Sequence, residues 1–329
     1  MSMDLVPNKS KNQASGRNTS KIHVSNHSIM MNWLLVGCLA TLSFGSYGLF
    51  SKLSAFEHPT VSNLVIYATA TICGIVLLVV TGSGVIFSKE SFLSGISSNI
   101  AALTMLYSLV SNQVLVVFSF VSFASVVFFL IVLGFEKPTL SGRQKWLACV
   151  GILVSVLGLF IASTSTVGGI NYVLKSATFN PDFLVIAPLM PLGFGLWSYF
   201  SFVAIKKKGA KVPTVFFNYS FGSILVATTS YLVFAQGFPL PRFSELRDIF
   251  PVVAGFFVAV GVIFALQSFR MTSGESRIEE TVVAILANAE IIPLMFLSYF
   301  ILGEFTIEGF LGALMVFLGL SILNSARVS

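Results

Sequence analysis

The sequence predicts an all-α integral membrane protein with ten transmembrane helices arranged as two inverted five-helix repeats. Three observations lead to this fold class. Of the 329 residues, 55% are hydrophobic and only 10% are charged, whereas about a quarter of the residues in soluble domains are charged. Apolar stretches of roughly the 20 residues that cross a bilayer recur along the chain. Finally, the two halves of the chain carry similar short motifs in the same order.

Residues 1–30 are polar, basic and rich in Ser and Asn, so we expect a disordered tail and no signal peptide there. Residues 31–163 and 183–325 form the two predicted halves, joined by an external linker at 164–182. The predicted spans are 31–52, 61–80, 92–109, 113–134, 146–163, 183–205, 213–235, 249–269, 281–301 and 307–325.

The positive charges predict the orientation, because segments rich in Lys and Arg stay in the cytosol. With the N-terminus inside, 15 of the 19 Lys and Arg residues fall in cytosolic segments. The four exceptions are Lys52, Lys175, Arg242 and Arg247. We therefore expect both termini to be cytosolic.

The internal repeat is visible in short motifs. Residues 41–51 and 191–201 align without gaps at an offset of 150 and share five identities in eleven positions. Two further pairs of motifs follow in the same order, namely Pro59-Thr60 with Pro213-Thr214 and Leu133-Gly134 with Leu302-Gly303. Because each half has an odd number of helices, the second half would enter the membrane in the opposite orientation. Such inverted repeats are associated with alternating access around a site at the bilayer midplane.

These motifs resemble those of EamA-type members of the drug/metabolite transporter superfamily. The resemblance rests on Phe-Gly-x-Tyr/Trp at 44–47 and 194–197, on the Leu-Gly-(x)-Glu endings, and on the last span at 312–320. It covers residues 31–325 and implies cytosolic termini and a cavity lined mainly by helices one, three, four, six, eight and nine. Phe135, inserted before Glu136, departs from the Gly303-Glu304 order of the second half.

Glu290 is the only charged residue deep within a predicted span. A carboxylate there costs at least a few kcal/mol unless it faces a wet cavity, pairs with a cation or is protonated. We predict that Glu290 binds a cationic or zwitterionic group or a coupling proton; the alternative is a neutral, hydrogen-bonded structural residue. Pro293 should bend the same helix. Asn288 points to the opposite face, where an interhelical hydrogen bond is its expected role.

Eight further positions are candidates for lining or entering the cavity, or for letting helices approach closely. Tyr47 and Trp197 occupy matching repeat positions deeper than the interfacial aromatic belt, as cavity walls or as packing residues. Gln267 either reaches the cavity or bonds another helix, and Glu279 either lines the cytosolic entrance or is a solvated helix-start acid. The predicted close-packing glycines are Gly45, Gly48, Gly193 and Gly195.

The sequence contains no HExxH, GxSxG or P-loop motif, so we expect no enzyme, no metal site and no cofactor. We expect a secondary transporter or facilitator of a small cationic, zwitterionic or neutral metabolite, such as an amino acid or amine, in a plasma or bacterial inner membrane. Its partners would be the substrate and the lipid bilayer but no nucleic acid, with a coupling proton and a homodimer left open. The alternatives are an endomembrane nucleotide-sugar or organophosphate carrier, which the lack of midplane cations disfavours, and a non-transporting scaffold.

Overall fold

A computed structural model describes most of the chain. The described residues are 19–54, 58–111, 117, 121, 123–136, 141–164, 186–235, 238, 240–241, 245–272, 277–287, 289–290, 292–293, 297 and 307–328. Their regular elements are all helical. Those of the first half are α1 (Thr19–Ser54), α2 (Pro59–Thr81), α3 (Lys89–Ser111), α5 (Ala124–Glu136) and α6 (Gly142–Thr164).

The described elements of the second half are five α-helices and two short helices of other types. These are α9 (Leu189–Phe202), the π-helix η2 (Val203–Lys207), α10 (Val212–Phe234), the 3₁₀ helix η3 (Leu246–Ile249), α11 (Phe250–Met271), α12 (Arg277–Ala287) and α14 (Ile307–Val328). Each of the ten predicted spans overlaps one of the helices described in the two halves.

Five of the described helices are long and apolar enough to cross a membrane. They cover Asn32–Ser54, Pro59–Thr81, Lys89–Val110, Leu189–Lys207 and Phe250–Met271. Shorter apolar helices cover Ala124–Phe135 and Phe310–Leu323. These helices identify an all-α, multi-pass membrane protein.

The first helix differs from its prediction at its start. It begins at Thr19, so residues 19–30, which were expected in the disordered tail, continue the helix of the first span. This segment contains no Pro or Gly that would stop a helix from extending toward the N-terminus. Residues 1–18 of the predicted tail and 165–182 of the predicted linker lie outside the described residues.

Pro and Gly residues set several other helix ends. Proline lies in the first turn of α2, α10 and α11, where its missing N–H removes no helical hydrogen bond. Gly82 ends α2 with φ of 58°, in the left-handed region that glycine adopts at low cost.

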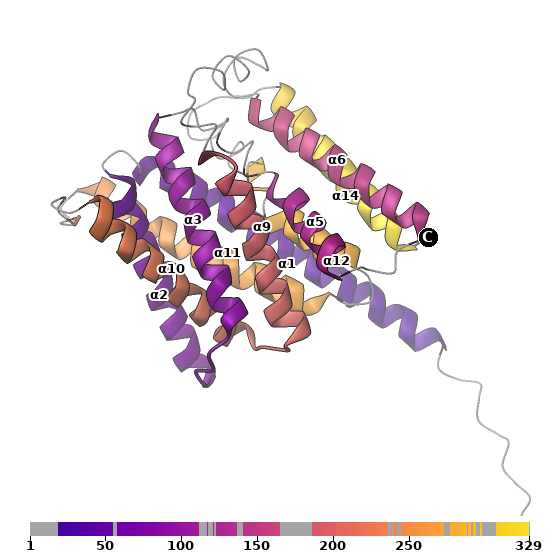
Figure 1. The fold of residues 1–329 in the computed structure, drawn as a ribbon. Coiled ribbons are helices and arrows are strands. Elements are labelled where there is room, and N and C mark those ends of the chain that lie inside the picture. The colour runs from indigo at the N-terminus through magenta and orange to yellow at the C-terminus, as the bar shows by residue number, and fades with distance from the viewer. Residues whose placement is uncertain are drawn as a thin grey trace, which may run out of the picture.

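The bundle is formed mainly by contacts between the two halves. Helix α1 packs on α11, α3 packs on α9 and α10, and α2 packs on α10 and α11. Helices α6 and α14 run side by side at the edge of the bundle (Figure 1).

Glycines bring α6 and α14 close together. A Cβ atom added to Gly158 would lie 2.6 Å from the carbonyl oxygen of Gly312, and one added to Gly319 would lie 2.6 Å from that of Gly151. Small residues of this kind let membrane helices pack with their backbones in contact. The pairing of α6 with α14 therefore depends on these glycines.

Candidate functional site

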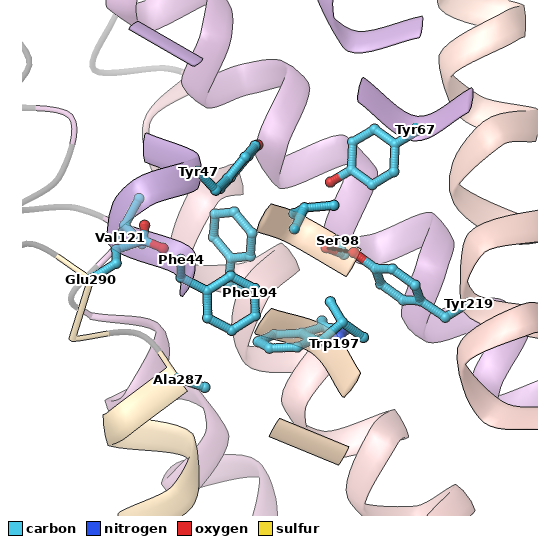
Figure 2. Close-up of a pocket in the computed structure, with 12 residues that line it drawn as sticks. Phe44, Tyr47, Tyr67, Ser98, Val121, Phe194, Trp197, Tyr219, Ala287 and Glu290 are labelled. Carbon is cyan, nitrogen blue, oxygen red and sulfur yellow. Dashed lines mark hydrogen bonds between the residues drawn. The ribbon is translucent and has the colours of Figure 1, made fainter. Parts of the chain in front are cut away.

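Side chains from both halves enclose a small cavity (Figure 2). Most of them are aromatic or aliphatic. The lining residues are Phe44, Tyr47, Tyr67, Ser98, Val121, Phe194, Trp197, Tyr219, Val258, Val262, Ala287 and Glu290. The cavity volume is about 10 Å³, which is room for about one water molecule. In this conformation the site is closed to any larger molecule.

The aromatic wall combines equivalent positions of the two predicted repeats. Phe44 and Tyr47 come from α1, and Phe194 and Trp197 come from the corresponding turn of α9. The rings of Phe44 and Trp197 meet edge to face, with centroids 5.6 Å apart and planes at 85°. Such a pair is a stable aromatic arrangement, so α1 and α9 are held together at the cavity.

Three buried polar atoms in this wall have no hydrogen-bond partner within the described part of the chain. They are the Tyr47 hydroxyl, the Trp197 Nε1 and the Glu290 Oε1. Leaving a buried polar atom unpaired costs about 1–3 kcal/mol, and more when the group is charged. Native proteins pair nearly all such atoms. Two donors and one acceptor without partners, all on residues that line one cavity, therefore point to a ligand or water site.

Glu290 is positioned by an interruption in its predicted span. The helix expected at 281–301 ends at Ala287, and Glu290 lies in a turn with only 5% of its surface exposed. The predicted span is therefore interrupted beside Glu290, and Ile292 and Pro293 are helical again beyond the turn. The physical reason is that Pro293 cannot donate to the Ala289 carbonyl and its ring crowds that position.

Gly45 allows this turn to approach α1. A Cβ atom at Gly45 would lie 2.4 Å from Pro293 Cγ and 3.0 Å from the Glu290 carbonyl oxygen. At the equivalent position of α9, a Cβ at Gly195 would lie 2.6 Å from Val127 Cγ1. A Cβ at Gly193 would lie 2.6 Å from the Ser97 carbonyl oxygen. These three glycines sit at helix contacts around the cavity.

A hydroxyl cluster closes the other side of the cavity. The Ser98 and Tyr219 hydroxyls are 3.1 Å apart and share a hydrogen bond between α3 and α10. Figure 2 shows the Tyr67 hydroxyl pointing toward the same two groups. Tyr67 and Tyr219 are each only 1% exposed. This cluster links three helices beside the site.

We expect Tyr219→Phe to lower the free energy of unfolding by about 1 kcal/mol, the usual loss for one interhelical hydrogen bond. Tyr231→Phe is the matched control, because its hydroxyl donates to the Phe238 carbonyl at 3.0 Å in an exposed position. Chemical denaturation in detergent would measure both. Equal stability of Tyr219→Phe and the wild type would contradict a structural role for the Ser98 contact.

Glu279 lies in a buried cluster away from the cavity. Glu279 and its neighbour Glu280 are 2% and 1% exposed, in the first turn of α12. The Thr272 hydroxyl donates to Glu280 Oε1 at 3.4 Å. Lys206 donates to the backbone carbonyls of Thr272 and Arg270. Lys206 thus ties η2 to the end of α11. Glu279 lies in the first turn of its helix as predicted, but it is buried and not solvated, and it is not among the residues that line the cavity.

The other predicted residues are distributed differently. Gln267 is half-buried on α11 and is not among the residues that line the cavity. Gly48 is buried within α1. Asn288 lies outside the described residues. Of the predicted substrate-binding residues, the structure thus brings Tyr47, Trp197 and Glu290 together.

Sequence reasoning missed the hydroxyl cluster and the two phenylalanines. Phe44 and Phe194 carried a usable signal, because both are identical positions in the aligned repeat motif. Tyr67, Ser98 and Tyr219 carried none, since only the crossing of α2, α3 and α10 brings them to one place. Within the described residues, no group of three or more His, Cys, Asp or Glu side chains could hold a metal ion.

Comparison with known proteins establishes the fold alone. No family model matches the chain, and no curated protein matches it. A crystal structure with 14% sequence identity superposes with a TM-score of 0.68, covering 90% of this chain and 98% of the other. The chain is therefore a helical membrane protein with the same overall fold as a solved structure, at an identity too low to transfer a function.

Proposed function

We propose that this protein is a secondary transporter or facilitator that moves a small cationic or zwitterionic metabolite, such as an amine or amino acid. The observation that carries the proposal is the closed cavity in which Tyr47, Trp197 and Glu290 present unpartnered polar atoms. Their chemistry is complementary to such a molecule. A carboxylate accepts hydrogen bonds from an ammonium group, and the hydroxyl and indole N–H donate to a carboxylate.

The aromatic side chains around Glu290 fit the same substrate class. Phe44, Phe194 and Trp197 offer ring faces or edges to the cavity, and a cation over an aromatic face gains about 0.5–2 kcal/mol. No Lys, Arg or His is among the twelve lining residues. A phosphorylated substrate would lack the cationic partners that it requires, which disfavours the nucleotide-sugar and organophosphate alternative.

The pattern of helix contacts supports an inverted repeat of five and five helices. In the proposed repeat, α1 corresponds to α9 and α3 corresponds to α11. The contact of α1 with α11 therefore corresponds to the contact of α9 with α3. Likewise α2 with α11 corresponds to α3 with α10, and α5 with α9 corresponds to α1 with α12. An exchange symmetry of this kind is expected when two repeats enclose a central site.

The proposed repeat would also account for the single carboxylate among the lining residues. The separation of 169 residues between Gly134 and Gly303 also relates Val121 to Glu290, and both of these residues line the cavity. The first half thus supplies a valine where the second supplies a carboxylate. A substrate would be oriented with its ammonium group toward the α12 side.

Transport through this site requires movement, because the cavity has room for about one water molecule. We propose that the described conformation is an occluded one and that the halves rock about the glycine contacts to open it. The contacts from Lys206 to the end of α11 would be broken and remade on the predicted cytosolic side.

The proposed orientation places both termini in the cytosol. The tail contains three glycosylation sequons, at Asn8, Asn18 and Asn26, which could be modified only in the lumen or outside the cell. We therefore expect no mobility shift when the protein, expressed in a glycosylating host, is treated with glycosidase. A shift that disappears after Asn→Gln changes at these sequons would reverse the orientation.

The proposal is tested by a ligand screen on the purified full-length protein. Unfolding temperature would be measured with amino acids, amines, drug-like cations, nucleosides and sugar nucleotides. A ligand at 100 times its dissociation constant adds about 2.7 kcal/mol to the native state, and hits would proceed to flux assays in liposomes. Stabilisation and saturable flux of a cationic or zwitterionic compound are expected.

The same screen separates the alternatives. If sugar nucleotides alone stabilised the protein, the carrier alternative would replace the proposal. Binding without any saturable flux would favour a scaffold that retains the fold. In that case, substitutions in the cavity would leave the protein's cellular role unchanged.

A further inference from the structure

A second and larger cavity lies between two connections at one end of the bundle. Residues 82–88 join α2 to α3, and residues 208–211 join η2 to α10. They surround a cavity of about 560 Å³. Both connections fall on the predicted cytosolic side and adjoin the ends of apolar helices, so we expect them to lie near the lipid headgroups.

Hydrogen bonds from α10 fix the walls of this cavity. The Asn218 side chain donates to the Ile86 carbonyl at 2.8 Å and accepts from the Ser88 backbone N–H at 3.4 Å. The Thr214 hydroxyl donates to the Gly84 carbonyl at 3.3 Å. Three hydrogen bonds thus hold the first connection against α10, the helix that follows the second connection.

The cavity is positively charged. Lys89, Lys208 and Lys211 line it, whereas Glu90 is the single acid among its lining residues. Glu90 forms an ion pair with Lys208 at 2.8 Å. The exposed side chains of Lys89 and Lys211 therefore leave two positive charges at the cavity beyond this pair. An anion is the complementary ligand.

The rim of the cavity is apolar and exposed. Val85, Ile86 and Phe87 have 68%, 70% and 66% of their surfaces accessible, on a connection of only a few residues. Large apolar side chains beside lysines at the ends of membrane helices are expected to insert into the interface between headgroups and acyl chains. A soluble anion would not explain these three side chains, but a lipid would.

We propose that this cavity binds the phosphate headgroup of an anionic phospholipid of the cytosolic leaflet. Lys89 and Lys211 contact the phosphate, and Ile86 and Phe87 lie against the acyl chains. Basic pockets between transmembrane helices on the cytosolic side are suited to such headgroups. The site is separate from the cavity at Glu290, so it does not depend on the proposed transport function.

The test uses the full-length protein in detergent micelles with phosphatidylglycerol or phosphatidylcholine as the probe, and native mass spectrometry to measure lipid retention. We expect phosphatidylglycerol to bind at least about tenfold more tightly than phosphatidylcholine. The double variant Lys89→Gln/Lys211→Gln should lose about tenfold or more of this affinity, because each surface lysine contributes about a factor of five. Lys89→Arg/Lys211→Arg should retain most of it.

Arg143→Gln/Lys145→Gln is the matched control, since it removes two exposed charges from the same predicted side but outside the cavity. It should change the affinity by less than about twofold. An equal loss in both double variants would overturn the proposal, because binding would then follow overall charge. Two further results would overturn the lipid assignment: displacement of the lipid by equimolar glycerol phosphate, and unchanged retention in Ile86→Ser/Phe87→Ser.

Discussion

Replacing Glu290 by Gln is expected to weaken binding of a cationic or zwitterionic substrate by about 30-fold or more. The side chain keeps its size but loses the negative charge that would pair with an ammonium group. Removing one partner of a buried charged pair costs about 2–5 kcal/mol, and every 1.4 kcal/mol is a factor of ten in affinity. Ligand-dependent unfolding temperature and uptake into liposomes would measure the loss.

The interpretation requires that the variant be folded. Glu290 has only 5% of its surface exposed and an oxygen without a described partner, so neutralising it should leave the stability without ligand equal to or above that of the wild type. Glu245→Gln removes an exposed carboxylate outside the cavity and should leave binding unchanged. Substrate affinity and flux that are the same in Glu290→Gln and the wild type would exclude Glu290 from the site.

Much of the fold could be predicted because membrane helices are recognisable from their length and apolar composition. All ten predicted apolar stretches overlap described helices, since twenty apolar residues in a row have few other stable arrangements. Helix ends were less predictable. The start of α1 at Thr19 and the end of α12 at Ala287 depend on the local backbone conformation, which hydropathy does not predict.

The site could be predicted where a residue differed in chemical type from its neighbours in the sequence or matched a position in the other half. Glu290 stood out as a charge within an apolar stretch, and Tyr47 and Trp197 stood out because the two halves align there. Both signals are local in sequence. Gln267, by contrast, is a polar residue within a predicted span and was expected either to reach the cavity or to bond another helix. It is not among the residues that line the cavity.

The hydroxyl cluster shows what sequence alone could not supply. Tyr67, Ser98 and Tyr219 lie on three helices, and Ser98 and Tyr219 are separated by 121 positions in the chain. Their meeting depends on the distance at which α3 crosses α10. That distance is set by glycines at the crossing, which lie outside the repeated motifs.

Substituting Gly95 by Val is therefore expected to destabilise the protein by about 3 kcal/mol or more and to disrupt the site. A Cβ atom at Gly95 would lie 2.0 Å from the carbonyl oxygen of Tyr219, and one at Gly222 would lie 2.3 Å from that of Phe92. Overpacking costs about 1–3 kcal/mol even when side chains can move aside. Here the obstacle is backbone, so the helices must separate.

The separation should also break contacts that reach the cavity. The Ser223 hydroxyl donates to the Gly95 carbonyl at 3.0 Å, and Ser98 lies one turn beyond Gly95 on the same face of α3. Moving α3 away from α10 would part Ser98 from Tyr219 and open this wall. Ligand affinity should therefore fall together with stability, although Gly95 itself does not line the cavity.

Gly134→Val is the matched control for this prediction. Gly134 lies in α5, and an added Cβ would meet no atom within 4 Å. The same substitution should change stability there by less than about 1 kcal/mol, because only helix propensity is altered. Denaturation in detergent, together with ligand binding, would compare the two. Equal effects at both positions would mean that the α3–α10 crossing does not depend on Gly95, and that Ser98 and Tyr219 are held together by other contacts.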